Sequence, residues 1–140
     1  MPLELTHLRN AIEALADLLD VAENDARMSQ LTAVERDGIR AGVIKNFEIT
    51  YELCWKLTAR WLNSYVSHGI ADGVTRRELF RLGAESRLIL DVEQWMQYHE
   101  TRNKTVHIYD AEQAERVYRA TREFAHDARR LLAALAARND

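Results

Sequence analysis

Apolar residues recur every three or four positions through most of the chain, which is the spacing of one face of an α-helix. The first such segment covers roughly residues 3–23 and a long one covers roughly residues 34–66, with residues 24–33 as a connection between them. The most regular stripe lies in the last segment and comprises Ala114, Val117, Tyr118, Thr121, Phe124, Ala125, Ala128, Leu131, Leu132 and Leu135. No stretch alternates apolar and polar residues as a half-buried strand does. The pattern therefore predicts an all-α protein.

The starts of three helices are marked by residues that favour helix N-termini. Thr75, Asp91 and Asp110 are each followed three positions later by Glu or Gln, which is the spacing of a capping box. The first of these helices is short and ends near Ser86, and residues 67–74 form the loop before it. Four substantial amphipathic helices and one short helix are typical of an up-and-down four-helix bundle, which is the predicted architecture.

The composition agrees with a helical globular domain. Only five Gly and one Pro occur in 140 residues, so little interrupts long helices. The hydrophobic fraction of 47% and the charged fraction of 29% are ordinary for a globular protein, and we expect residues 1–140 to form a single domain. Cys54 is the only cysteine, which excludes an intramolecular disulfide and a cysteine zinc site.

Charge and hydropathy limit where in the cell the protein is expected and what it is expected to bind. The net charge of −3, from 19 Lys and Arg against 22 Asp and Glu, does not suit a general polyanion binder, so nucleic acid would have to meet a local cationic cluster. No run of apolar residues is long enough to span a membrane. Acidic residues interrupt Met1–Leu19, where a signal peptide would have its apolar core. We therefore expect a cytoplasmic protein with no membrane partner.

Two Glu-x-x-His pairs, Glu4 with His7 and Glu123 with His126, resemble the ligand pairs of di-iron helix bundles. On a helical wheel Glu123 and His126 fall about 150° from the centre of the last apolar stripe, so they are expected to face water. Glu4 and His7 lie in the first turn of the first helix, where fraying disfavours a rigid site. We therefore predict neither a metal site nor a cofactor.

The apolar pattern of the penultimate helix is interrupted by polar residues near its end. Val92, Trp95 and Met96 define the inward face. Continuation at helical spacing places His99 and then Asn103 on that face, with Arg102 at its edge. Polar residues where a core face should continue indicate a site. The alternative is that the helix leaves the core there and that these side chains bond to backbone groups.

Arg102, Asn103, His107 and Tyr109 fall within eight residues, which favours a site over an isolated polar residue. In an unbroken helix Arg102 and His107 would lie about 140° apart and would not readily share a ligand. Adjacent β-branched residues precede His107, and a new cap follows Tyr109. The helix is therefore predicted to end between Asn103 and Val106, so that His107 folds back toward Arg102.

An arginine and a histidine without a carboxylate cluster suit metal-independent cleavage of a phosphodiester bond. His107 is a candidate acid or base, because imidazole titrates near neutrality and can exchange a proton with a ribose 2′-hydroxyl or the leaving oxygen. Arg102 is a candidate for holding the phosphate as charge develops, and Asn103 for positioning. His99 and Lys104 are candidate supporting residues. The substrate would be RNA, since DNA lacks the internal nucleophile.

The segment Arg102-Asn-Lys-Thr-Val-His107-Ile-Tyr109 resembles the Arg-x4-His-x-Tyr signature of HEPN-domain toxins of the HepT type, also known as nucleotidyltransferase substrate-binding proteins. Further likeness lies in residues 43–56, 77–80 and 110–118, in the order expected of the family. The sequence departs from the family's pattern at Thr75, where a Pro is common, and at Arg87, where a Gly often stands.

The resemblance implies a HEPN-like bundle that forms a homodimer, with Arg-x4-His elements of both subunits in a shared cleft. It also implies a ribonuclease toxin that is neutralised by a cognate minimal nucleotidyltransferase antitoxin, which in some members transfers AMP to the tyrosine of the motif, here Tyr109. A bulky anionic adduct there would compete with RNA phosphate for Arg102. Other members are known only as substrate-binding subunits. A non-catalytic subunit of a nucleotidyltransferase complex is therefore the alternative, and a purely structural bundle is a third hypothesis.

The sequence leaves the role of two further groups of residues open. One group lies in a stretch that resembles the family and comprises Glu48, Glu52 and Trp55. The other lies in the short helix and comprises Arg76, Arg77 and Arg81. The sequence context of the first group indicates no chemistry. The arginines are candidates for guiding RNA or an acidic partner, and a solvated helix face explains them equally well.

Overall fold

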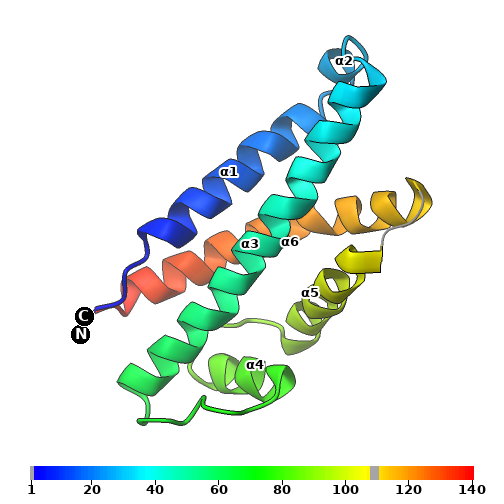
Figure 1. The fold of residues 1–140 in the computed structure, drawn as a ribbon. Helices are drawn as coiled ribbons and strands as arrows, with labels where there is room; N and C mark the ends of the chain where they lie inside the picture. Colours follow the sequence, from blue (N-terminus) through cyan, green and yellow to red (C-terminus); the bar gives the residue numbers. More distant parts are fainter. Residues whose placement is uncertain (1, 108–110) are drawn as a thin grey trace.

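Helices make up all the regular structure in the computed structural model of the chain, which describes residues 2–107 and 111–140 (Figure 1). The elements are α1 (Thr6–Ala22), α2 (Asp25–Met28), α3 (Ala33–Tyr65), α4 (Arg76–Glu85), α5 (Val92–Lys104), the short 3-10 helix η1 (Thr105–His107) and α6 (Ala111–Ala137). The predicted all-α class and the expected order of the helices are confirmed.

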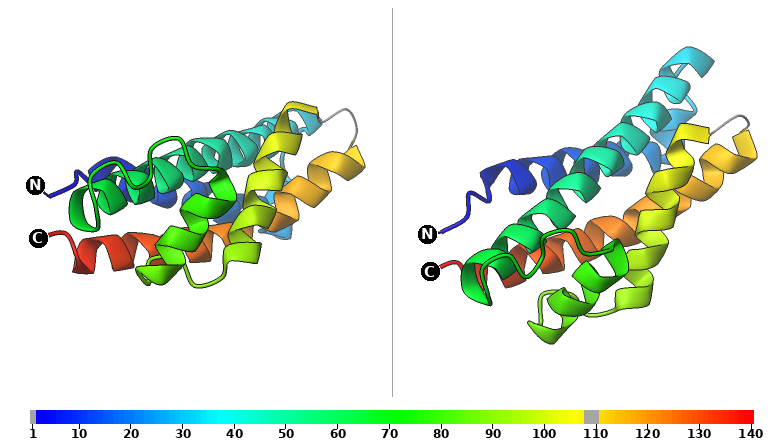
Figure 2. Two further views of the ribbon diagram at one scale, coloured as in Figure 1. Left: turned by 90° about the horizontal axis from the view of Figure 1, so that it is seen from below. Right: turned by 60° about the horizontal axis from the view of Figure 1, so that its bottom comes forward.

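The longest helices, α1, α3 and α6, form the body of the bundle. α1 packs along α3, and α6 contacts both of them. α4 packs on α3 and α5, while α5 contacts both α3 and α6 (Figures 1 and 2). The two ends of the chain lie together, and Asn139 Nδ2 donates a hydrogen bond of 2.9 Å to the carbonyl of Leu3. α1, α3, α5 and α6 are thus the four main helices, with α4 as the predicted short one.

Phe124 of α6 occupies the junction of α3, α5 and α6. The centroid of its ring lies 4.9 Å from that of Phe47, 5.1 Å from that of Tyr98 and 5.8 Å from that of Trp95. All four rings are buried, and their edge-to-face contacts stabilise the junction beyond the area they remove from water. This aromatic cluster holds α5 against α3 and α6, and α5 carries most of the candidate site residues.

Capping residues begin the helices where the sequence predicts. The side chains of Thr75 and Asp91 each accept a hydrogen bond of 3.1 Å from the backbone N–H three residues on, which satisfies a donor that the first turn leaves without a partner. Thr32 forms a complete capping box with Glu35 at the start of α3, a cap that was not among the predicted ones. The third predicted cap, Asp110, lies outside the described residues.

The connection expected between residues 24 and 33 contains a short helix, α2, so that expectation was wrong in part. Asn24 caps α2 by accepting a hydrogen bond of 3.0 Å from the backbone N–H of Arg27. The helix buries one side chain, Met28. A single turn has too few residues to display apolar periodicity, which is why the pattern did not reveal it.

The end of α4 gives a physical reason for one departure from the family's pattern. The N–H of Arg87 bonds to the carbonyl of Ala84 at 3.0 Å, and the N–H of Leu88 bonds to that of Gly83 at 2.8 Å. These two bonds form a Schellman motif, and Arg87 occupies its left-handed position with φ 63°. Glycine is favoured there because it lacks the Cβ atom that makes this conformation costly for arginine.

Glu4, His7, Glu123 and His126, which form the two Glu-x-x-His pairs, are all exposed. This confirms the helical-wheel prediction for Glu123 and His126, whereas Glu4 precedes α1 and does not lie in its first turn. Within residues 2–107 and 111–140, no group of three or more His, Cys, Asp and Glu side chains is arranged to hold a metal ion. None of the described helices combines the length and the apolar character needed to cross a membrane.

Candidate functional site

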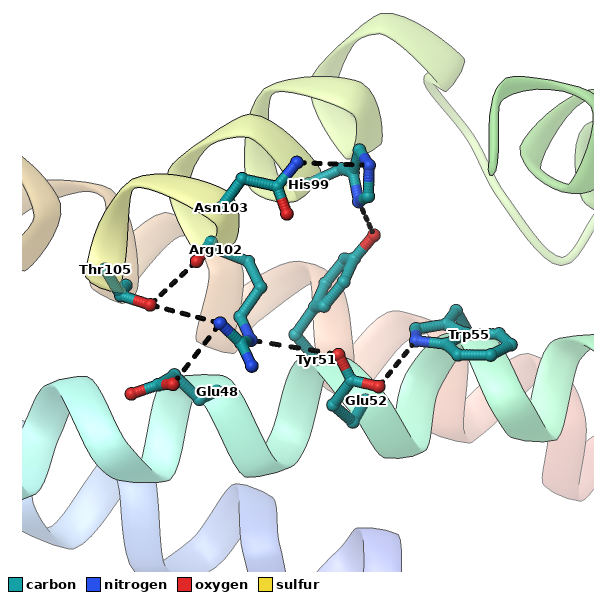
Figure 3. Close-up of polar contacts among 8 residues, drawn as sticks. All are labelled: Glu48, Tyr51, Glu52, Trp55, His99, Arg102, Asn103 and Thr105. Atoms are coloured by element: carbon teal, nitrogen blue, oxygen red, sulfur yellow. Dashed lines mark hydrogen bonds and ion pairs between the residues drawn. The ribbon is translucent and has the colours of Figure 1, made fainter. Parts of the chain in front are cut away.

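α5 ends at Lys104, inside the predicted interval, and η1 follows it directly. At the junction, Thr105 Oγ1 donates a hydrogen bond of 2.7 Å to the carbonyl of Arg102 and accepts one of 3.2 Å from Arg102 Nη1 (Figure 3). The first bond satisfies a carbonyl at the helix end, and the second fixes the arginine side chain. Arg102 and Lys104 also place positive charge at the negative end of the helix dipole.

The guanidinium of Arg102 lies against two glutamates of α3 (Figure 3). Its Nη1 is 3.3 Å from Glu48 Oε2, and its Nε is 3.7 Å from Glu52 Oε1. The side chains of Arg102 and Glu48 are only 25% and 21% exposed, so their attraction is less screened than that of a surface pair. Arg102 Nε is buried without a hydrogen-bond partner in the described chain, so charge holds it toward Glu52.

His99, one turn earlier on α5, connects the same helix to Tyr51 of α3. Tyr51 Oη lies 2.8 Å from His99 Nδ1, and Asn103 Nδ2 lies 3.4 Å from His99 Nε2 (Figure 3). A neutral imidazole has one donor and one acceptor nitrogen, so both contacts are satisfied when Nδ1–H donates to Tyr51 and Nε2 accepts from Asn103. Burial lowers the pKa of His99, as does the charge of Arg76, and both favour this neutral form.

Glu52 links Arg102 to an aromatic side chain of α3. Its carboxylate accepts a hydrogen bond of 3.0 Å from Trp55 Nε1 (Figure 3). Arg76, at the start of α4, stacks on the ring of Trp55, and its Cζ lies 3.6 Å from the centroid of that ring. The residues that gather around Arg102 are called here the α3-facing cluster: Glu48, Tyr51, Glu52, His99 and Arg102.

The local sequence of α3 assigns no role to Glu48, Tyr51 or Glu52. A signal was nevertheless present, because Glu48, Glu52 and Trp55 follow one another at spacings of four and three residues. Such spacing places polar groups along one face of a long helix whose other positions are apolar. The sequence of α3 alone does not show which helix packs against that face. In the structure this helix is α5.

The arginines of α4 do not share one surface role. Arg77 forms an ion pair with Glu93 of α5, and Arg81 lies 3.9 Å from Glu78 within α4. Arg76 instead stacks on an aromatic ring beside the α3-facing cluster. Of the three, Arg76 is therefore the one whose position bears on the site.

A cavity of about 340 Å³ lies where α5 and η1 meet the start of α6. It is called here the α6-facing cavity, and its lining residues are Thr101, Lys104, His107, Gln113, Arg116 and Val117. Thr101 and Lys104 are three residues apart on α5 and therefore share a face, whereas Arg102 projects from a different face toward α3. Among the described residues, the cavity thus combines His107 with Lys104 but does not include Arg102.

The predicted site residues consequently fall in two places. Arg102 and His99 belong to the α3-facing cluster, with Asn103 beside them, and Lys104 and His107 line the α6-facing cavity. Tyr109 lies outside the described residues. The convergence of Arg102 and His107 on one phosphate stays a prediction.

The inward face of α5 differs in part from the expected one, since Trp95 is buried as predicted. Trp95 and Tyr98 are its buried residues, and Asn103, which was expected to face inward, is exposed. The reason is that α5 packs against α6 as well as α3, and the Tyr98 hydroxyl donates a hydrogen bond to Asp127 of α6. The inward face is therefore turned toward α6 compared with the one predicted from apolar spacing alone.

These features define an all-α bundle with charged residues at the end of α5, which lies between α3 and α6. The chain belongs to the family described as nucleotidyltransferase substrate binding protein like, which matches residues 3–137. The resemblance inferred from the signature and its neighbouring stretches is thereby confirmed.

Relatives of known name or structure agree with this assignment. The chain is 34% identical over 114 residues to a Haemophilus influenzae protein named probable ribonuclease HepT, covering 76% of this chain and 74% of that protein. A solved Haemophilus influenzae structure, described as the fold of a substrate binding domain of a nucleotidyltransferase, matches with a TM-score of 0.89 and 27% identity over 95% of this chain and 99% of that one. A crystal structure from Thermus thermophilus matches with a TM-score of 0.68 and 26% identity, covering 89% of this chain and 98% of that one.

Proposed function

We propose that the chain is a metal-independent ribonuclease and the toxin of a toxin–antitoxin pair whose antitoxin is a minimal nucleotidyltransferase. The observation that carries this proposal is the arrangement at the end of α5, where two glutamates hold Arg102 and where His107 lines a cavity. The relative named as a probable ribonuclease supports the same activity.

In this proposal His107 supplies acid–base chemistry and Arg102 holds the reacting phosphate. The imidazole takes the proton of a ribose 2′-hydroxyl, whose oxygen attacks the neighbouring phosphorus. The bond from phosphorus to the 5′-oxygen of the next nucleotide breaks, and this oxygen takes a proton from water. The products are a 2′,3′-cyclic phosphate and a 5′-hydroxyl end. Arg102 stabilises the negative charge that builds on the phosphate oxygens, and Asn103 positions the phosphate. His99 and Lys104 support these residues.

A homodimer completes the site. Arg102 faces α3 and His107 lines the α6-facing cavity, so a second copy is what brings an arginine and an imidazole to one phosphate. Val106, which is 64% exposed, and Ile49, which is 43% exposed, are apolar side chains next in sequence to His107 and Glu48. Exposed apolar groups at these positions suit a contact between two copies.

Cleavage of RNA in the presence of EDTA tests the reaction, and mixing two inactive variants tests the shared site. Arg102→Ala and His107→Ala proteins, each inactive alone, should recover about a quarter of wild-type activity when mixed equally, because half of the dimers are hybrids with one intact site each. Absence of recovery after subunit exchange would contradict the shared site. Cleavage by His107→Ala at the wild-type rate would contradict the ribonuclease.

The nucleotidyltransferase neutralises the toxin by transferring AMP to Tyr109. The tyrosine oxygen attacks the α-phosphorus of ATP, and pyrophosphate leaves. Intact-mass measurement after co-expression with the partner should reveal one or more AMP additions on the wild-type chain and none on Tyr109→Phe. An unchanged mass for the wild-type chain, with the partner active, would contradict this step.

The second candidate function is a non-catalytic subunit that binds substrate for a nucleotidyltransferase. It is favoured by the structural relative described as a substrate binding domain, and by the two carboxylates that offset the charge of Arg102. Expression of the chain without its partner separates the two functions. Growth arrest by the wild-type chain, but not by His107→Ala, selects the ribonuclease, and normal growth with folded wild-type protein present selects the subunit.

A further inference from the structure

We infer that the α6-facing cavity is a subsite that binds one nucleotide of single-stranded RNA, with its phosphate between Lys104 and Arg116. The inference rests on the proposed ribonuclease function, because it states how that site holds its substrate. None of the described residues that line the cavity is acidic, whereas Lys104, His107 and Arg116 are basic side chains. An anion is therefore the ligand that the lining favours.

The cavity has a basic lining, whereas the molecule as a whole carries a negative net charge. The chain carries a net charge of −3, so its surface as a whole does not attract RNA. Arg102 on the other face of α5 is already close to two carboxylates. Lys104 and Arg116, beside the imidazole of His107, thus form a local cationic cluster that binds RNA in addition to Arg102.

The size of the cavity selects a single nucleotide rather than a duplex. Its volume of about 340 Å³ lies at the lower end of the range of about 300 to 1,000 Å³ that small-molecule sites occupy. A base in a duplex is stacked and paired and cannot enter such a cavity, whereas a base of a single strand can be turned out into it. Thr101 and Gln113 add a hydroxyl and an amide to the lining, and Val117 adds an apolar surface for a base or ribose.

Arg116 has a partner that a phosphate can replace. Its Nη1 lies 3.3 Å from Glu112 Oε1, one turn earlier on α6, and the two side chains are 64% and 82% exposed. Such an exposed pair contributes little to stability. A phosphate in the cavity offers the guanidinium a second, charge-assisted contact of the kind that arginine favours.

α6 also supplies a matched control residue. Arg119 is an exposed arginine whose Nε lies 3.3 Å from Glu115 Oε1, again one turn earlier on the same helix. Its local pairing thus repeats that of Arg116, but Arg119 is not among the residues that line the cavity. Comparing alanine variants of the two arginines separates the effect of the cavity from the loss of one positive charge on α6.

The experiment measures binding of a short single-stranded RNA that carries fluorine at every 2′-position, which removes the attacking hydroxyl and prevents cleavage. Fluorescence anisotropy at several salt concentrations gives the Kd for the wild-type, Arg116→Ala and Arg119→Ala proteins. Arg116→Ala should weaken binding about tenfold, because a charge-assisted contact is lost. It should also reduce the slope of log Kd against log salt by about 0.7, the value for one phosphate contact on a single strand. Arg119→Ala should change Kd less than about twofold.

Cleavage of ordinary RNA by the same proteins keeps this inference separate from the proposed function. If wild-type protein cleaves RNA, His107→Ala does not, and Arg116→Ala binds and cleaves like Arg119→Ala, the cavity is not a subsite while the ribonuclease stands. If no protein cleaves RNA but binding of the fluorinated strand depends on Arg116, the cavity stands and the ribonuclease does not. Free AMP is the third probe, and binding of AMP as tight as that of the strand would replace the RNA subsite by a mononucleotide site.

Discussion

The two sides of α5 differ in how closely acidic side chains surround their positive charges. On the α3-facing cluster, Arg102 lies within 3.3 Å and 3.7 Å of Glu48 and Glu52 oxygens. On the α6-facing cavity, Lys104 and Arg116 line a space whose described wall contains no acidic side chain. Arg102 is paired with two carboxylates in a partly buried setting, whereas Arg116 is paired with one exposed carboxylate, Glu112, so the cations of the cavity retain more attraction for an incoming anion. In the proposed function, the α3-facing cluster positions a functional group and the α6-facing cavity binds substrate.

The largest effect is expected from replacing the histidine of each face in turn. His107→Ala should lower the rate of RNA cleavage by about 100- to 10,000-fold, which is the usual contribution of an acid or base. His99→Ala should lower it less than about tenfold, because His99 is bonded to Tyr51 within the α3-facing cluster. Single-turnover rates measure both effects, and circular dichroism checks the fold. Equal losses for the two variants would remove the distinction between the faces.

Removing the acidic partners of Arg102 and of Arg116 should change different kinetic constants. Glu48→Gln combined with Glu52→Gln leaves Arg102 less well positioned, so kcat should fall by about tenfold or more with little change in KM. Glu112→Gln releases Arg116 from its surface partner, so KM should fall by about twofold with kcat unchanged. Steady-state kinetics on one RNA substrate provide the test. Tighter RNA binding by the glutamine pair would instead mean that the glutamates compete with phosphate for Arg102.

A substitution outside both faces should change stability without changing activity. Arg87→Gly relieves the left-handed conformation at φ 63° and should raise the free energy of unfolding by about 0.5 to 1 kcal/mol. Urea denaturation measures this gain, and the rate of RNA cleavage should equal that of the wild type. A lower stability would show that the arginine side chain stabilises the turn more than its backbone conformation destabilises it.

The smallest effect concerns the pH dependence of stability and is confined to the α3-facing cluster. Burial, followed by the charge of Arg76, lowers the pKa of His99 below its ordinary value of 6.5. As the pH falls below about 6.5, the unfolded chain therefore takes up a proton before the folded chain does, and the free energy of unfolding decreases. This contribution is present in full above that pH and is lost on acidification.

His99→Gln should accordingly flatten the pH dependence of the urea midpoint just below pH 6.5, since the group that binds protons unequally has been removed. His126→Gln provides the control, because His126 is an exposed imidazole on α6. A change of slope for His126→Gln equal to that for His99→Gln would contradict a special environment for His99.

The local sequence determined the helices, their order and several of their ends. The apolar stripe of α6 includes the buried residues Phe124 and Leu131, because a 3.6-residue repeat can be read without knowing what the helix packs against. Thr75 and Asp91 begin α4 and α5 because a cap acts only on the next turn of the chain. The signature at Arg102 and the family to which the chain belongs could also be identified from the sequence, since both depend on residues near one another in sequence.

Tertiary structure alone decided what those residues contact. The partners of Arg102 are Glu48 and Glu52, about fifty residues away in sequence, and no spacing rule links two separate helices. Tyr98 rather than Asn103 faces inward because α6 packs against α5 at that side, which the apolar spacing of α5 alone does not determine. The cavity of Lys104, His107 and Arg116 likewise exists only because two helix ends meet. Local periodicity and capping act within a few residues, whereas a site depends on the packing of distant helices.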